Sequence, residues 1–465
     1  MTVDTLRSVK KQFALTNCVF YSNNFTILDI CHSISDNERL AAVTAASTCF
    51  DHKLASVHDE ELDAGADSAL CKHLSLLLMK HHFIQDPAKG PSQMNYKLWN
   101  EISLTCATIE MIYRCELPKL GESFHRVGNE LLPLLLTVMA HVLQKFQEEE
   151  NQRKECSSDF DGEDDLENPW RISILAVTKI VAHYATVTTA LVPMAQQIGL
   201  LSTLKRIASP SASLPENARF SSLWTLANLA CDADNMLMMS CHQGLVDALV
   251  RVAYDDPSYE ARTHAAKAIA NLAWRPENKI PLSERPMLLD AMVKLMGSSI
   301  TKTRRHAAKA FRFLSDAPSS TKLRLCKHNN HKILATVLKR ASNDADRAVR
   351  ECAATTLCNL VCNETAFMMG NHSGLLDTLA NIAVMTERGN APTLAGEALC
   401  ELAQFITPEM KCFNALNRAI ESVVSFESDS NNGNAHSSLT NFSVRRENML
   451  ARLSEIYKNN CSQEV

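Results

Sequence analysis

A short helical sequence motif recurs at nearly constant intervals in the second half of this 465-residue chain. Its copies are LWTLANLA at 223–230, AKAIANLA at 266–273, AKAFRFLS at 308–315, ATTLCNLV at 354–361 and EALCELAQ at 397–404. The residues before the shared Leu are Asn228, Asn271, Phe313, Asn359 and Glu401, at intervals of 43, 42, 46 and 42 residues. Four near-equal intervals with matching flanks predict a repeat array.

A second landmark precedes each copy and marks where an earlier helix begins. GLLSTL, GLVDAL and GLLDTL begin at Gly199, Gly244 and Gly374, and the corresponding segments of the other two copies begin at Pro286 and Lys332. Gly and Pro are typical of helix boundaries. Each repeat is therefore predicted to contain a short first helix, a second helix that starts at this landmark, a turn, and a third helix.

The turn before the third helix contains Asp255, Asp256 and Pro257 in one copy. An Asp is a favourable N-cap, and Pro is tolerated at the first helical position. We therefore expect Asp256 to cap the third helix and Pro257 to begin it.

A period of 42–46 residues with Gly before the second helix and Asn-Leu near the end of the third resembles the armadillo repeat. Ankyrin and tetratricopeptide repeats have shorter periods, and HEAT repeats share the period without these two features. The resemblance covers roughly residues 196–405. It implies an all-α fold, a right-handed superhelical solenoid.

The expected organisation has four parts, with about six or seven repeats between residues 38 and 425. Residues 1–37 form an N-terminal segment, and 38–195 hold degenerate armadillo-like repeats with helices at 38–55, 68–82, 99–115, 129–146 and 169–185. An acidic loop is expected at 147–168. Regular armadillo repeats fill 196–425, and 426–465 form a Ser/Asn-rich tail with a terminal helix packed loosely on the array.

Composition agrees with a helical protein and narrows its environment. Gly and Pro, at 13 and 15 residues, are scarce, and the net charge of −5 argues against a chain that is basic throughout. The sixteen Cys include no C-x-x-C pair, and Cys352, Cys358 and Cys400 lie in apolar helical pattern. Free thiols, the absence of a signal-like N-terminus and an apolar stretch of only 13 residues at 131–143 predict a cytoplasmic or nuclear protein without membrane insertion.

Positions i, i−4 and i−8 of the third helix share one stripe, which a stacked array presents on one face. We call these positions the third-helix ladder. In chain order they hold Phe220, Trp224 and Asn228; Thr263, Lys267 and Asn271; Arg305, Lys309 and Phe313; Glu351, Thr355 and Asn359; and Thr393, Glu397 and Glu401.

The armadillo resemblance implies that ladder Asn residues hold the backbone of an extended peptide in a concave groove. An amide side chain both donates and accepts, as a peptide unit does. This role falls on Asn228, Asn271 and Asn359, while Phe313 and Glu401 depart from the pattern. The alternative is that these Asn residues only brace neighbouring helices.

Trp224 and Asn228 form a W-x-x-x-N pair, which resembles the pairs that importin-α repeats use for basic nuclear localisation signals. The pair occurs once here, and residues 1–60 hold only five basic residues. A nuclear transport receptor is therefore the alternative function, and Trp224 packed in the core is the alternative reading of that residue.

The segment 294–340 contains twelve Lys or Arg and one acidic residue, Asp316. Like charges in a groove reinforce one another's field, and the lysine-lined groove of β-catenin, which binds acidic peptides, is similar. We therefore expect an extended, acidic protein segment as partner. The groove is expected to run from aromatic and amide positions at Trp224, through basic Lys267, Arg305 and Lys309, to acidic Glu397 and Glu401. The partner should show the complementary order, with a basic end at the acidic positions. The lack of interleaved aromatic residues disfavours nucleic acid.

The acidic loop at 147–168 has the sign needed to occupy that basic groove itself. Autoinhibition by this loop is a hypothesis, in which deletion of the loop raises peptide affinity at low salt. The competing reading of the basic segment is a solvated charged face.

The sequence contains no motif of a catalytic or cofactor site. G-x-S-x-G, G-x-x-x-x-G-K-[ST], G-x-G-x-x-G and H-E-x-x-H are absent. Cys326, His328 and His331 are close in sequence but match no zinc spacing. The chain is therefore expected to be a non-enzymatic adaptor or scaffold without cofactor or metal.

Overall fold

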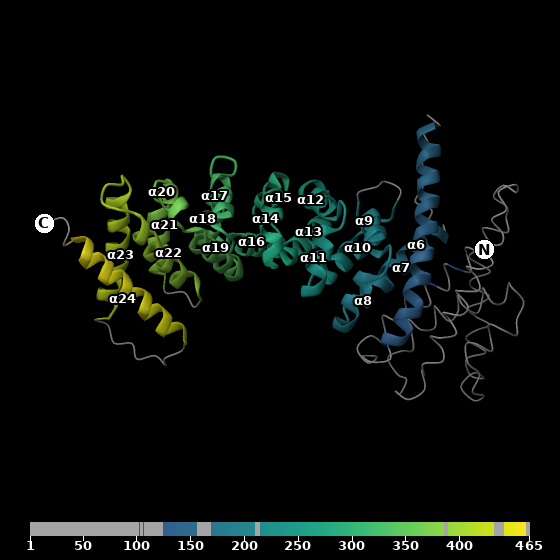
Figure 1. The fold of residues 1–465 in the computed structure, drawn as a ribbon, viewed down its shortest axis with the longest axis horizontal. Coiled ribbons are helices and arrows are strands. Elements are labelled where there is room, and N and C mark those ends of the chain that lie inside the picture. The colour runs from purple at the N-terminus through teal and green to yellow at the C-terminus, as the bar shows by residue number, and fades with distance from the viewer. Residues whose placement is uncertain are drawn as a thin grey trace, which may run out of the picture. The chain divides into compact units, whose positions relative to one another are not determined.

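The computed structural model describes residues 102, 106, 124–155, 169–209, 214–385, 389–431 and 441–461, and these residues form helices and connections without a strand. The expected helices at 38–55 and 68–82 lie outside the described residues, as does most of 99–115. The chain divides into two compact units, Met1–Asn235 and Met236–Val465. Figure 1 shows the helices and their labels.

Unit 1 contains the long helix α6 (Phe124–Glu155), then α7 (Pro169–Tyr184), a 3-10 turn at Thr188–Ala190, α8 (Leu191–Gln196), α9 (Leu200–Ala208) and α10 (Glu216–Leu229). Helices α7 and α10 pack together, as the third helices of successive repeats do. The predicted helices at 129–146 and 169–185 correspond to α6 and α7.

The expected acidic loop begins later than predicted, because α6 continues to Glu155. Its added residues are mainly Glu, Gln, Lys and Arg, which are good helix formers. Contacts along the helix reinforce it, since Lys145 Nζ lies 2.6 Å from Glu148 Oε2 and Gln144 donates to the same carboxylate at 3.1 Å. Residues 156–168 of that loop lie outside the described residues.

Unit 2 repeats a three-helix pattern. The helices, in order, are α11 (Ala233–Cys241), which crosses the division between the units, α12 (Leu245–Asp255), α13 (Tyr259–Leu272), α14 (Pro276–Ser283), α15 (Pro286–Met296), α16 (Thr301–Ser315), α17 (Ser319–Lys327), α18 (Lys332–Asn343), α19 (Arg347–Leu360), α20 (Asn363–Gly370), α21 (Leu375–Ala383) and α22 (Ala391–Phe405). Two helices follow, α23 (Phe413–Asn431) and α24 (Asn441–Cys461). The fold of the described chain is an α-solenoid of armadillo-type repeats, as predicted.

The predicted second-helix landmarks have the backbone that their residues favour. Gly199, Gly244 and Gly374 precede α9, α12 and α21 with φ of 87°, 68° and 72°, in the left-handed region. Pro286 is the first residue of α15. In the repeat without Gly or Pro, His331 takes the same left-handed position with φ 67°.

The start of α13 differs from the prediction. The N-cap is Ser258, whose hydroxyl accepts from the Ala261 N–H at 3.5 Å, and the helix begins at Tyr259. Asp256 instead ends α12, and its carboxylate accepts from the Ser258 N–H at 2.9 Å. Asp256 therefore holds the turn, and the next polar residue caps the helix.

A repeated arginine holds three of the turns between second and third helices in unit 2, those before α13, α16 and α19. Arg262, Arg304 and Arg350, at intervals of 42 and 46 residues, donate from Nη1 to turn carbonyls. Arg304 also makes a bidentate pair with Asp344, at 2.8 and 3.0 Å, and Arg340 reaches the same carboxylate at 3.3 Å. The Asp344 side chain is fully buried, and that of Arg304 is nearly so.

We expect Gly374→Ala to lower the free energy of unfolding by about 1 kcal/mol, because Ala is strained at positive φ. A Cβ at Gly374 would meet no atom within 4 Å, so the loss of stability would come from backbone strain and not from a steric clash. Urea unfolding measures it. Asn381→Ala, on the exposed side of α21, is the control and should be neutral or stabilising.

Asp344→Asn should destabilise unit 2 by about 3 kcal/mol, because it leaves the Arg304 charge buried without its counter-ion. Burial raises the pKa of Asp344, but the hydrogen bond from Arg304, that from the Asp346 N–H and the charges of Arg304 and Arg340 outweigh it and lower the pKa overall. The wild type should therefore lose this stability as the pH falls below about 4, the unfolded pKa of Asp.

Urea unfolding at pH 7 and below pH 4 tests this, since the difference between Asp344→Asn and the wild type should shrink in acid. Asp346→Asn, which keeps an N-cap and removes a half-exposed pair with Arg305, should cost less than about 1 kcal/mol. Equal losses for the two substitutions would contradict the assignment.

Candidate functional site

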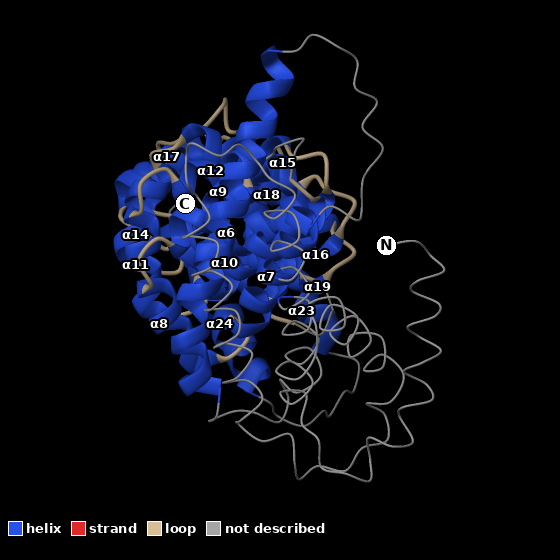
Figure 2. Cartoon of the chain, turned by 90° about the vertical axis from the view of Figure 1, so that its right-hand side faces the viewer, coloured by secondary structure: helices blue, strands red, loops and turns tan. Residues whose placement is uncertain are grey.

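The third helices α13, α16, α19 and α22 pack in sequence order and carry the ladder positions of unit 2. Small buried residues such as Ala265, Ala308 and Ala354 let these helices approach closely. Figure 2 shows α16 and α19 on the opposite side of the unit from α11 and α14. The third-helix ladder is therefore a separate face from the first helices.

Cationic groups converge at the centre of this ladder. Lys309 Nζ lies 3.4 Å from Asn271 Oδ1 and 5.5 Å from the centre of the Phe313 ring. Burial lowers the pKa of His306 to about 4, and the charges of Lys267, Lys309, His264 and Arg305 add to this effect. His306 is therefore neutral at physiological pH and adds no positive charge to this face.

Carboxylates from outside the basic segment 294–340 neutralise part of its positive charge in the folded protein. Arg305 makes a bidentate pair with Asp346 at 2.8 and 2.5 Å. Arg304 and Arg340 bind Asp344, Arg324 binds Glu284 at 3.2 Å, and Lys294 lies 3.7 Å from Asp255. These acidic partners all lie outside residues 294–340, so the count over that segment did not include them.

The ladder Asn residues of unit 2 contact neighbouring helices. Asn271 is only 7% exposed and accepts from Lys309. Asn359 donates to the Arg312 carbonyl and the Ser315 hydroxyl of α16, both at 3.4 Å. The bracing alternative describes these contacts, and capture of a peptide backbone by these two residues remains a prediction. Thr355, between them on the ladder, donates to the Glu351 carbonyl within its own helix at 2.7 Å.

Two of the three aromatic ladder residues, Phe220 and Trp224, lie in unit 1 on α10. Trp224 is partly exposed, with its ring edge-on to His183 of α7 at a centroid separation of 6.0 Å. The Arg219 guanidinium lies 5.9 Å from the Phe220 ring centre. Asn228 is also partly exposed, so all three predicted side chains reach the surface of α10.

The acidic end of the ladder is occupied by the chain's own C-terminal helix. Arg445 of α24 donates two hydrogen bonds to Glu397, each 2.7 Å, and Arg452 donates to Glu401 at 3.1 Å. Met449 and Leu453 are buried, and a Cβ on Gly396 would lie 2.3 Å from Met449 Sδ. The expected loosely attached tail helix is instead tightly packed, because α22 carries both an apolar seat and two counter-charges.

These contacts make α24 the third helix of a final, incomplete repeat. It packs on α22 and α23, as α22 packs on α19 and α21. The sequence contained a signal for this, since Arg445 and Arg452 follow Glu397 and Glu401 by 48 and 51 residues, about one repeat. The Ser/Asn-rich segment between α23 and α24 lengthens this interval beyond the 42–46 residues of the other repeats.

The compact Cys and His cluster has ordinary structural contacts. His328 Nε2 lies 2.9 Å from Asp290 Oδ1, and His331 Nδ1 lies 2.8 Å from the Cys326 carbonyl. Over the described ranges, no group of three His, Cys, Asp or Glu side chains is arranged to hold a metal ion. Cys400, predicted as a core thiol, is buried, whereas Cys352 and Cys358 are partly exposed.

In the described part of the chain no single helix is long and apolar enough to cross a membrane. Helix α7 and the segment Thr188–Gln196 are long and apolar enough only when taken together, and a bend of 106° separates them. Most of the α7 side chains are buried within unit 1.

No family model and no curated protein matches this sequence. Solved structures do resemble the fold. An engineered protein determined by a structural genomics consortium superposes with a TM-score of 0.64 at 15% identity, over 98% of this chain and 94% of its own. A designed armadillo repeat protein matches with a TM-score of 0.45 at 19% identity, over 56% of this chain and 99% of its own. Another, solved in complex with the peptide (KR)4, has a TM-score of 0.42 at 17% identity, over 63% of this chain and 99% of its own.

We expect Met449→Ala to lower the free energy of unfolding by about 2–4 kcal/mol, because it opens a cavity between α24 and α22. Arg452→Ala should cost less than about 1 kcal/mol, because that side chain is half exposed and its pair with Glu401 is screened by water. Urea unfolding followed by circular dichroism compares the two. A similar small loss for both would mean that α24 is not part of the cooperative fold.

Proposed function

We propose that this protein is a non-enzymatic scaffold that binds an extended, acidic segment of a partner protein on the third-helix ladder of α13 and α16. The observation that carries the proposal is the position of Lys309, whose Nζ lies 3.4 Å from Asn271 Oδ1 and 5.5 Å from the centre of the Phe313 ring, on the same ladder as Lys267. Lysine ammonium groups are point charges that suit carboxylates approaching from several directions.

The neighbouring contacts indicate which cations are available to a partner. Arg305 already shares its guanidinium with Asp346, so a ligand would have to compete for it. Lys309 instead contacts the neutral Oδ1 of Asn271 and the Phe313 ring. Lys309 is therefore the first residue expected to meet a carboxylate, with Phe313 beside it for an apolar or aromatic neighbour.

The extent of the bound segment follows from α24. Because Arg445 and Arg452 bind the acidic ladder residues of α22, the site proposed here ends before that helix. The partner is then an acidic segment over α13 and α16, without the basic end that the sequence order predicted.

Charge reversal of the two lysines tests this function. The double variant Lys267→Glu/Lys309→Glu should bind a fluorescein-labelled, Glu- and Asp-rich peptide of about a dozen residues at least roughly tenfold more weakly than the wild type, measured by anisotropy of the full chain. Binding by the wild type should also weaken as salt is raised, because exposed charges are screened.

The matched control is Lys339→Glu with Lys332→Glu, which makes the same charge change on α18, a second helix. It should leave peptide affinity close to that of the wild type. An equal loss in both variants, or no binding of the acidic peptide by the wild type, would contradict the proposal.

A Lys- and Arg-rich peptide of the same length tests the alternative function, a nuclear transport receptor. This alternative is supported by the partial exposure of Trp224 and Asn228 on α10. Selective binding of the basic peptide, lost in Trp224→Ala, would favour it over the acidic-segment scaffold.

A further inference from the structure

Large apolar side chains recur at one position of the first helices of unit 2, on a different face from the ladder. Leu237 of α11 is 39% exposed, Ile280 of α14 is 41% exposed and Phe367 of α20 is 53% exposed. Leu323 of α17 is partly exposed at the same position. The intervals between these four residues are 43, 43 and 44, so they share one repeat register. We call this set the first-helix stripe.

Buried polar anchors fix that register. Asn278 donates to the Leu272 and Met236 carbonyls at 3.0 and 3.1 Å, and Thr365 donates to the Leu360 carbonyl at 2.6 Å. Ile280 and Phe367 each follow their anchor by two residues. Residues two apart lie on opposite sides of a helix, so the anchor that points inward turns the apolar residue outward.

The four helices form a continuous row. Ser240 of α11 donates to Asn278 of α14 at 2.5 Å, and Arg324 of α17 donates to Ser283 of α14 at 2.9 Å. Helix α17 also packs against α20. Isolated exposed apolar residues are ordinary, but four in one register on adjacent helices are typical of an interaction surface.

We propose that the first-helix stripe binds an amphipathic helix of a partner protein that lies across the row. Adjacent packed helices are roughly 8–10 Å apart, which sets the spacing of the stripe residues. A helix advances about 10 Å in about seven residues, so apolar residues at every seventh position of the partner would meet successive members of the stripe. The four members span about 30 Å, or about 20 residues of helix.

Charge beside the stripe specifies the partner further. Glu277 and Glu364 lie three residues before Ile280 and Phe367, on the same side of their helices and exposed. Glu277 forms a salt bridge with Arg275, with 2.9 Å between Oε2 and Nε. Glu364 instead accepts hydrogen bonds from neutral groups, and these lower its pKa more than the charge of Lys322 does. The partner helix therefore carries Lys or Arg next to its apolar residues, most of all at the end that meets α20.

The probe for this site is a synthetic helix of about 22 residues with Leu at every seventh position, Lys beside each Leu, and Ala and Gln elsewhere. Fluorescence anisotropy with the full chain should show saturable binding. Ile280→Gln/Phe367→Gln should weaken it at least roughly tenfold.

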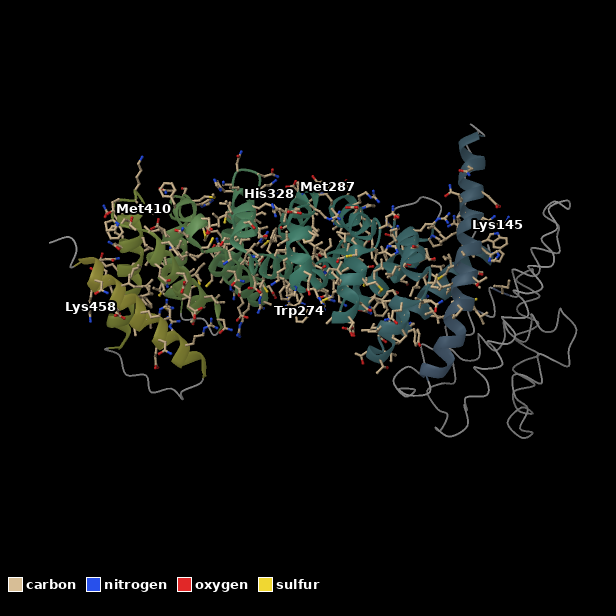
Figure 3. The ribbon with its side chains drawn as sticks, viewed as in Figure 1. Lys145, Trp274, Met287, His328, Met410 and Lys458 are labelled. Atoms are coloured by element: carbon tan, nitrogen blue, oxygen red, sulfur yellow. The ribbon has the colours of Figure 1, made fainter. Side chains whose placement is uncertain are left out.

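Met287→Gln is the matched control, because Met287 is 48% exposed on the second helix α15 and outside the stripe. Figure 3 labels Met287 on the opposite edge of unit 2 from Trp274, which lies just before α14. This variant should bind the probe as the wild type does.

A second probe, with Gln in place of each Lys, tests the charge. Glu364→Lys should weaken binding of the Lys probe and leave binding of the Gln probe nearly unchanged. No binding of the Lys probe, or equal binding by the stripe variant and the Met287 control, overturns the proposal. Sedimentation that shows self-association abolished by Ile280→Gln/Phe367→Gln would overturn it too, since the occupant would then be a second copy of this chain.

Discussion

Burial between neighbouring repeats is the constraint on which unit 2 depends. A single repeat of two or three short helices exposes an apolar face that it cannot cover alone, so each third helix packs on the next. The buried positions of α13 and α16, such as Ala265, Ile269, Ala308 and Phe311, form this continuous core. Because Ala occupies many of them, the helices lie close enough for side chains of one repeat to reach the backbone of another. The ladder contacts and the ion pairs between repeats follow from that closeness.

Polar side chains then fix the register that apolar packing leaves open. Arg262, Arg304 and Arg350 hold the turns before the third helices, and Asn278 holds the start of a first helix against carbonyls of two segments. A buried donor without an acceptor is costly, so each of these contacts favours one alignment of neighbouring helices. The same alignment gives the third-helix ladder and the first-helix stripe their regular spacing. A buried polar side chain fixes the rotation of its helix, so equivalent residues of successive repeats face the same side.

The two proposed surfaces differ in chemistry because they lie on different helices. The third helices carry Lys267 and Lys309, and the partner proposed for them is acidic. The first helices carry apolar residues beside Glu277 and Glu364, so they suit an apolar and basic partner. A scaffold with two such faces could hold two partners together, one by an extended segment and one by a helix. At the end of the array, α24 covers the acidic ladder residues and supplies the last third helix.

The sequence by itself determined the repeat and the helix landmarks, because period and glycine placement depend on neighbours along the chain. Gly244 and Gly374 had to take left-handed backbone wherever the repeats stacked. Only the tertiary structure decided which charges are neutralised, since Arg305 meets Asp346 and Glu397 meets Arg445 across a repeat. The cap of α13 at Ser258 and the extension of α6 through Glu155 depend on neighbours along the chain. The tertiary structure also decided that Asn271 is buried. Pairing and burial depend on distances in space between residues about one repeat apart, and a linear pattern does not contain those distances.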